Sequence, residues 1–308
     1  MFTRKKALKI GAVIGTAGLA FSLASCASDG GAGDGGENDG AEDMGAITLG
    51  FIPSWTDGLS TAYLLENQLG KLGYTVEMEE LTEAGPLYAG LAGGDVDMYP
   101  SAWPEVTHAD YMDEFGDEIE DLGSYYDNAK LTITVPEYVD VDSIEDLAGR
   151  GEDFDGRIVG IEPGAGLTGA AESMIPEYGL EDEFSLETSS TAAMLAELEG
   201  AIENEEDIVV TLWRPFWPYG ELDLKDLEDP NGAMGEPEAL HFLGHTGFSD
   251  EFPEAADYIA GIQLDDVAYG ALESSVQQAS EDGEDAIRDA VDTWVSENGD
   301  AYETLITE

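Results

Sequence analysis

Three tryptophans stand at comparable places in this sequence, each beside an apolar run that has the pattern of a β-strand. Trp55 follows the run at 47–52, Trp103 follows the run at 96–99, and Trp213 follows the run at 207–212. Prolines at 215 and 218 prevent the segment after Trp213 from continuing as a regular helix or a central strand. In open α/β proteins, ligands bind beyond the carboxyl ends of strands. We therefore expect the three indole rings to face one cleft.

An aromatic cluster of this kind is suited to a cation. A cation over the face of a tryptophan gains ~0.5–2 kcal/mol, depending on how far it is desolvated. A quaternary ammonium group has no N–H to donate, so an aromatic cage can hold it where hydrogen-bonding side chains cannot. For any one of these residues ordinary core packing is the simpler interpretation, but three at equivalent positions favour a cage. Trp217 and Trp294 are assigned to ordinary packing.

The glycine-rich turn at 164–169 provides a candidate anion site. Its sequence, GAGLTG, fits the pattern GxGxxG between a predicted strand and a predicted helix, and Glu187 ends the next strand where a dinucleotide-binding protein would place its ribose ligand. Pro163 and an N-terminal export signal argue against a dinucleotide. Free backbone N–H groups at a helix N-terminus bind anions in general, and a carboxylate would fit.

The elements that must position these residues alternate between strand and helix. In the first unit the periodicity predicts strands at 47–52, 74–78, 96–99 and 131–135, and a short helix at 86–92. It also predicts a helix that Ser54 or Asp57 could cap and that ends at Leu72. In the second it predicts strands at 157–161, 185–187 and 207–212 and helices at 168–178 and 192–202, and a tail from about 236 adds one strand and further helices. We predict an α/β fold of two lobes, 47–135 plus 236–308 and 136–235, with the ligand cleft between them.

Five segments, in this order and spacing, resemble the glycine betaine/proline betaine-binding proteins of osmoprotectant ABC importers. The similarity extends from about residue 47 to 265. The segments are SW at 54–55, SAWPEVTHADY at 101–111, GIEPGAGL at 160–167, AAMLAELEGAI at 192–202 and VVTLWRPFWP at 209–218.

The resemblance implies a role for each site residue. Trp55, Trp103 and Trp213 would enclose the trimethylammonium group, whereas His108 and the backbone amides of Gly166 and Leu167 would hold the ligand carboxylate. It also implies a type II periplasmic-binding-protein fold that closes on its ligand by a hinge.

The implied function is the capture of glycine betaine outside the cytoplasm and its delivery to an ABC permease driven by an ATPase. Choline, carnitine or a sulfonium analogue would be an alternative ligand, and a surface enzyme acting on such compounds is an alternative class. We expect no enzyme activity and no cofactor, because the sequence contains no GxSxG elbow, Walker loop, CxxC pair or recognisable acid/base dyad.

Two residues depart from the family pattern. Glu105 lies between Trp103 and His108, where relatives tend to be apolar, and Arg214 follows a cage tryptophan where a small polar residue is more usual. In the cleft Arg214 would repel an ammonium group, so we expect it to point outward. His241 and His245 have a spacing seen in zinc helices, but no third ligand is apparent and we predict no metal site.

The N-terminal residues indicate export and lipidation. Residues 1–25 combine four basic residues with a short apolar stretch and read as a lipoprotein signal peptide, and Cys26, the only cysteine, falls at the cleavage point. Residues 26–46 are rich in glycine and acids and are expected to form a tether. The predicted location is the outer face of the cell membrane, with a lipid anchor at Cys26.

The charge of the mature chain is extreme. Without residues 1–25 it carries seven Lys and Arg against 68 Asp and Glu, a formal charge of −61. Such a surface repels nucleic acid and anionic lipid. An apolar content of 43% is not typical of a disordered chain. The high negative charge therefore indicates a folded protein that is adapted to salt.

Overall fold

The computed structural model describes residues 44–299, 302 and 304–307. The predicted signal peptide, Cys26 and almost all of the tether lie outside these residues. The described chain enters its first strand at Ala46, close to the predicted start of the folded body at residue 47.

Within the described residues, nine strands form a mixed sheet in the order β2-β1-β3-β9-β4-β7-β5-β6, with β8 paired to β4. The parallel pairs are β1 with β2 and β3, and β5 with β6 and β7. The strands are β1 (Ala46–Phe51), β2 (Thr75–Glu80), β3 (Met98–Ala102), β4 (Ile119–Pro136), β5 (Arg157–Val159), β6 (Ser185–Glu187), β7 (Val210–Arg214), β8 (Leu224–Asp226) and β9 (Glu238–His245).

Strand β4 joins two parts of this sheet. Its first part pairs antiparallel with β9, as far as Ala129 opposite Glu238. Its second part pairs with β7, beginning with Lys130 opposite Arg214, and with β8. We call β1, β2, β3, β9 and the first part of β4 the first half-sheet, and β5 to β8 with the rest of β4 the second half-sheet. The change of partner falls between two consecutive residues.

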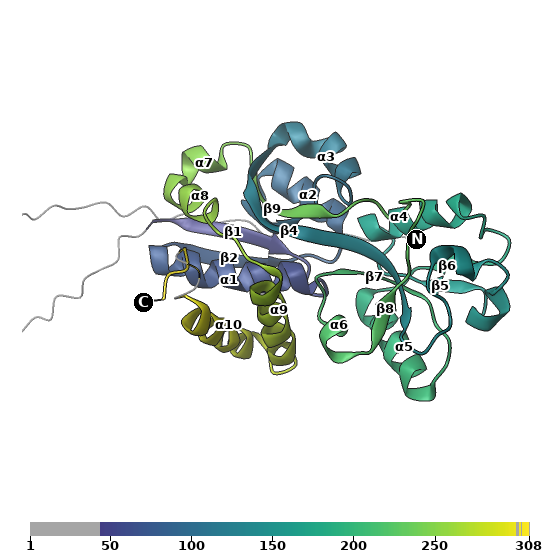
Figure 1. Cartoon of the computed structure of the whole chain (residues 1–308). Coiled ribbons are helices and arrows are strands. Elements are labelled where there is room, and N and C mark those ends of the chain that lie inside the picture. The colour runs from purple at the N-terminus through teal and green to yellow at the C-terminus, as the bar shows by residue number, and fades with distance from the viewer. Residues whose placement is uncertain (1–43, 300–301, 303, 308) are drawn as a thin grey trace, which may run out of the picture. The chain divides into compact units, whose positions relative to one another are not determined.

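Helices lie on both faces of the strands, as expected for an α/β fold (Figure 1). Among the described residues, no helix has the length and apolar character needed to cross a membrane. The helices are α1 (Thr56–Leu72), α2 (Ala84–Gly93), α3 (Ala109–Phe115), α4 (Gly166–Glu177), α5 (Thr191–Asn204), α6 (Pro218–Glu221), α7 (Phe248–Glu251), α8 (Pro253–Ile259), α9 (Asp266–Ser280) and α10 (Glu284–Asn298), with short 3-10 turns at Gly116–Glu118, Ile144–Leu147 and Gly151–Phe154.

Helix α1 illustrates how the sequence pattern forms these elements. Ala62, Leu65 and Leu69 recur three and four residues apart, as on one face of a helix, and are buried. Gly73 ends the helix in the left-handed region at φ 101°, and its N–H bonds back to the last turn. The sequence proposed Ser54 or Asp57 as the cap, but the N-cap is Trp55 and no side chain caps the helix.

Several predicted boundaries shift in the structure. The strand expected at 131–135 is the end of the much longer β4, and α4 begins at Gly166 rather than at 168. Strand β7 extends through Arg214, so Trp213 lies within the strand rather than after it. The sequence predicts a strand at 96–99, whereas β3 begins and ends later in the chain, at Met98–Ala102.

Candidate ligand-binding site

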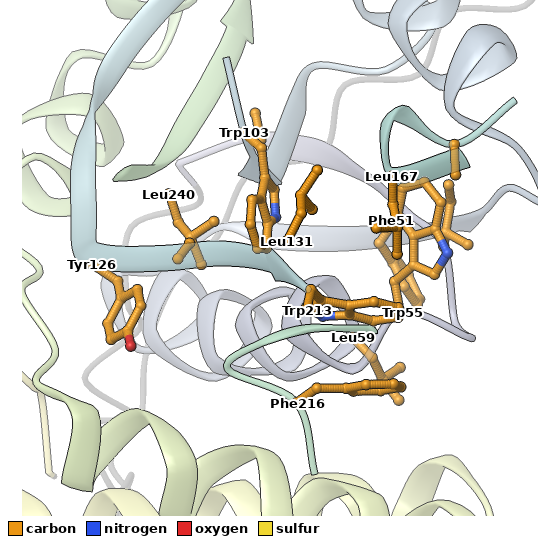
Figure 2. Packing of buried hydrophobic residues seen from close by; sticks show 14 of the residues in the cluster. Phe51, Trp55, Leu59, Trp103, Tyr126, Leu131, Leu167, Trp213, Phe216 and Leu240 are labelled. Atoms are coloured by element: carbon orange, nitrogen blue, oxygen red, sulfur yellow. The ribbon is translucent and has the colours of Figure 1, made fainter. Parts of the chain in front are cut away.

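The six side chains and amides predicted to hold a ligand all line one cavity. The cavity is small, with a volume of about 30 Å³. In Figure 2, Trp55, Trp103 and Trp213 approach the same region from separate segments. The lining residues are Trp55, Asp57, Trp103, Thr107, His108, Leu131, Ile161, Ala165, Gly166, Leu167 and Trp213.

The three tryptophans come from different elements and are almost fully buried. Trp55 precedes α1, Trp103 follows β3 directly, and Trp213 lies near the end of β7. Phe216 backs the ring of Trp213, with the ring centroids 3.8 Å apart and the planes 14° from parallel. This stack fixes the tilt of the Trp213 ring and accounts for Phe216 in the aromatic-rich segment 211–220.

The indole nitrogens of the three rings have different partners. Trp55 Nε1 donates to Glu162 Oε2 at 3.3 Å, and Trp103 Nε1 donates to Asp57 Oδ2 at 3.0 Å. Trp213 Nε1 is buried and has no hydrogen-bond partner among the described residues. An unpaired buried donor costs about 1–3 kcal/mol, so a ligand that accepted this N–H would gain affinity.

His108 is held at the cavity wall in a defined state. It is buried, and its Nδ1 lies 3.1 Å from the backbone N of Trp103 and 3.0 Å from Tyr88 Oη. Burial lowers the pKa of His108 from 6.5 to about 3, so the ring is neutral at physiological pH. Since Nδ1 accepts the Trp103 N–H, the proton of the neutral ring is on Nε2, which can donate to a ligand.

The glycine-rich turn approaches the His108 segment closely. A Cβ on Gly166 would lie 1.9 Å from the carbonyl oxygen of Thr107, so only glycine fits there. Glu238 holds that segment in place, because its carboxyl group accepts the backbone N–H groups of Glu105, Val106 and Thr107 at 2.9–3.1 Å. The Gly166 and Leu167 amides, at the start of α4, lie in the first turn of a helix, where N–H groups lack intrahelical partners.

Asp57 is the cavity residue of most chemical consequence that the sequence analysis did not assign to the site. Its carboxyl group is buried and accepts from Ser101 Oγ at 2.8 Å as well as from Trp103. Burial raises its pKa. The sequence analysis offers Asp57 only as a possible helix cap, and its position two residues after a predicted cage tryptophan was the signal for a place in the site. Thr107, Leu131, Ile161 and Ala165, the other unassigned lining residues, carry no charge.

The two departures from the family pattern do not disturb the cavity. Arg214 is absent from its lining and pairs with Asp226 through Nε–Oδ2 at 2.7 Å, with its guanidinium carbon 3.4 Å from the ring centre of Tyr219. This agrees with the expectation that Arg214 points away from the ligand. Glu105 is half exposed and accepts the backbone N–H of Ala239 at 2.8 Å.

His241 and His245 lie on β9, not on a helix. His241 Nδ1 is 2.9 Å from Asp121 Oδ1, a bond that raises the pKa of the histidine. Among the residues that the structure describes, no three His, Cys, Asp or Glu side chains are grouped to hold a metal ion. Trp217 and Trp294 both lie outside the cavity lining; Trp294 is buried, and its Nε1 donates to the backbone oxygen of Ala268 at 3.2 Å.

The chain matches one known protein family over most of its length. The family described as the substrate binding domain of ABC-type glycine betaine transport systems matches residues 45–297. The chain belongs to this family. The match covers most of the chain and confirms the resemblance seen in the five sequence segments.

Individual relatives agree with the family match. The glycine betaine/carnitine transport binding protein GbuC of Listeria monocytogenes is 36% identical over 152 residues, which span 49% of this chain and 49% of that protein. The glycine betaine/L-proline-binding protein ProX of Borrelia burgdorferi is 28% identical, with a TM-score of 0.77 over 85% of this chain and 97% of that one.

The lactococcal OpuAC, solved in a closed conformation with glycine betaine, is also 28% identical and has a TM-score of 0.77, over 85% of this chain and 99% of the other. These likenesses confirm the predicted fold class, a type II periplasmic-binding-protein fold. Members of this family are substrate-binding components of transport systems rather than enzymes.

Proposed function

We propose that this protein captures glycine betaine outside the cytoplasm and delivers it to an ABC permease driven by an ATPase. The observation that supports this most directly is the single cavity that brings together three tryptophans, His108 and the Gly166–Leu167 turn. One part of the cavity is suited to a cation without N–H groups and another to a carboxylate. Glycine betaine carries both groups within a few atoms.

In the proposed complex the trimethylammonium group lies among Trp55, Trp103 and Trp213. Cation–π attraction of ~0.5–2 kcal/mol per ring replaces the lost hydration of a group that cannot donate hydrogen bonds. The carboxylate accepts from His108 Nε2–H and from the amides of Gly166 and Leu167. Hydrogen bonds to a charged group are worth about 1.5–3 kcal/mol.

The proposed lobes are 47–135 plus 236–308 and 136–235. Trp55, Trp103 and His108 then come from the first lobe, and Gly166, Leu167 and Trp213 come from the second. A ligand that contacts both lobes stabilises the closed arrangement, and the permease recognises that arrangement. The hinge includes β4, where the partner strand changes between Ala129 and Lys130.

Choline is a second candidate ligand, because Asp57 places a carboxyl group in the cavity wall. A ligand with a net positive charge would favour the ionised form of this buried group, whereas a zwitterion would gain less from it. We further propose that the protein is not an enzyme and that a lipid on Cys26 anchors it to the outer face of the membrane.

Calorimetric titration with glycine betaine, proline betaine, carnitine and choline, at low and high salt, tests the proposal. We expect glycine betaine to bind most tightly. Tighter binding of choline would move the assignment to the second candidate, and the absence of heat with all four ligands would contradict the function. Proton NMR of the same mixtures over hours would reveal any product formed by an enzyme.

A further inference from the structure

Glu162 is a buried acid next to the cavity that has no part in the proposed ligand contacts. It follows β5 in the second half-sheet, is 9% exposed and is not among the cavity-lining residues. A buried carboxyl group is costly unless hydrogen bonds compensate for its lost hydration. Its partners therefore indicate its role.

One side of the Glu162 carboxyl group is fixed within its own half-sheet. Oε1 accepts the backbone N–H of Thr191 at 2.9 Å, and Oε2 accepts the Thr191 hydroxyl at 2.8 Å. Thr191 is the first residue of α5. The free N–H groups and the positive end of the helix dipole stabilise a carboxylate at this position.

The other side of the carboxyl group faces the segment that follows β1 in the first half-sheet. Oε2 accepts Trp55 Nε1–H at 3.3 Å, and Oε1 accepts the Ser54 hydroxyl at 3.5 Å. Each carboxyl oxygen thus receives one short hydrogen bond from Thr191 and one longer hydrogen bond from the other half-sheet. All four partner groups can donate to a carboxyl oxygen.

We propose that Glu162 is a positioning residue for Trp55 and that its bond to the indole forms only when the two halves of the cleft close. The inference rests on the proposed function, because it requires Trp55 to be part of the cation cage. Thr191 holds the acceptor ready in one half, and closure brings the indole N–H to it. The bond fixes the rotation of the Trp55 ring, so its face is held toward the cation in the closed form.

Two physical effects follow from this bond. The bond stabilises the oriented ring in the closed form and so offsets the side-chain entropy that the ring loses on closure, which increases affinity. A negative group on the N–H edge also increases electron density on the indole face, and this strengthens the attraction of a cation. Both effects require the indole N–H, so they disappear if residue 55 has no such group.

A double-mutant cycle between Glu162→Gln and Trp55→Phe tests this dependence. Glutamine has a similar shape, but its amide group would face two of the four donors. With the tryptophan present, we expect Glu162→Gln to weaken glycine betaine binding about 5- to 20-fold, the range for losing charge-assisted hydrogen bonds. With phenylalanine at 55, the same change should weaken binding less than about two-fold.

Tyr111 provides a matched control. Its hydroxyl donates to the carbonyl oxygen of Gly164 at 2.7 Å. Tyr111 thus connects the first proposed lobe to the glycine-rich turn through a hydrogen bond that does not involve Trp55. Tyr111→Phe should change affinity by the same factor with tryptophan or phenylalanine at position 55. Glu172→Gln removes one negative charge from an exposed position on α4, as Glu162→Gln does at a buried one, and so controls for the general effect of the lost charge.

NMR of the indole N–H groups provides a test on the unmodified protein. The Trp55 signal is assigned by its absence from the Trp55→Phe spectrum. On addition of glycine betaine it should shift downfield and exchange with solvent at least about ten-fold more slowly, as expected for a buried bond to a carboxylate. In Glu162→Gln the downfield shift should be lost, while the Trp103 signal should keep its position.

The outcomes separate the inference from the function on which it rests. If glycine betaine does not bind the unmodified protein, the proposed function fails. If it binds, but Glu162→Gln causes equal losses with either residue at 55, the positioning role is wrong and the function stands. If Glu162→Gln does not fold, the NMR experiment on the unmodified protein is the test. An indole N–H signal of Trp55 that does not change when glycine betaine is added overturns the proposal.

Discussion

The Nδ1 atom of His108 accepts the backbone N–H of Trp103 at 3.1 Å. This one contact determines the tautomer of the buried, neutral ring and leaves the proton on Nε2. It also connects His108, which is proposed to bind the ligand carboxylate, to Trp103, a predicted cage residue five positions earlier. The W-x4-H spacing, which reads as two separate ligand contacts in the sequence, is one hydrogen-bonded unit in the structure.

We expect His108→Ala to weaken glycine betaine binding about 10- to 100-fold, because it removes a donor to a charged group. Choline has a hydroxyl in place of the carboxylate, so it should lose less from the same substitution. Titration of both ligands into both proteins measures the difference. Equal losses for the two ligands would show that His108 acts only through packing.

The free energy of unfolding should depend on pH through the protonation of His108. Its pKa is about 3 in the folded protein and 6.5 ordinarily, so between these values the unfolded chain binds a proton that the folded one does not. The contribution of His108 to stability is therefore complete above about pH 6.5 and is lost as the pH falls toward 3. Urea unfolding at pH 7.5 and 5 should show a smaller decrease for His108→Gln than for the unmodified protein; equal decreases would refute the assignment.

Trp213→Ala should cost on the order of 1–3 kcal/mol in glycine betaine binding, because it removes one cage face and admits water. Trp213→Tyr should retain much of the affinity, since a tyrosine face still attracts a cation. Trp294→Ala is the control, expected to lower the thermal midpoint and to leave binding unchanged, because Trp294 is buried away from the cavity. The reverse pattern, with Trp294 affecting the ligand and Trp213 not, would disprove the cage.

Gly166→Ala should reduce glycine betaine affinity by more than about ten-fold, since the new Cβ would overlap the Thr107 carbonyl oxygen and force the cavity walls apart. Gly169→Ala makes the same chemical change one turn later in α4, where a Cβ meets nothing within 4 Å. That control should bind normally and gain about 0.5–1 kcal/mol in stability from alanine's helix propensity. Calorimetry and thermal unfolding of the pair test this, and similar affinities for both variants would count against the close approach.

The thermal midpoint should rise markedly between low salt and about 1 M NaCl, where the Debye length falls to ~3 Å and screens the repulsion among carboxylates. The formal charge of −61 after residue 25 is the basis for this expectation. Differential scanning calorimetry on the chain without residues 1–25 would measure it. A midpoint that stays constant or falls with salt would argue against salt adaptation.

The sequence alone was sufficient for the features that depend on local pattern. Apolar periodicity predicted the alternating strands and helices, including β6 to the residue, because side-chain spacing along an element follows from its backbone geometry. The order and spacing of Trp55, Trp103, His108, Gly166 and Trp213 indicated the family. These residues then proved to line the same cavity, although their roles in binding remain predictions.

Only the tertiary structure decided which groups meet across long distances in the chain. The bond from Trp55 to Glu162 joins residues 107 positions apart, and the bond from Trp103 to Asp57 joins residues 46 apart. Neither pairing is encoded in a local period, because it depends on strand order and on the register of β4 with its two partners. The sequence thus indicated the chemistry of the cage, whereas the fold determined which carboxyl groups hold its rings in place.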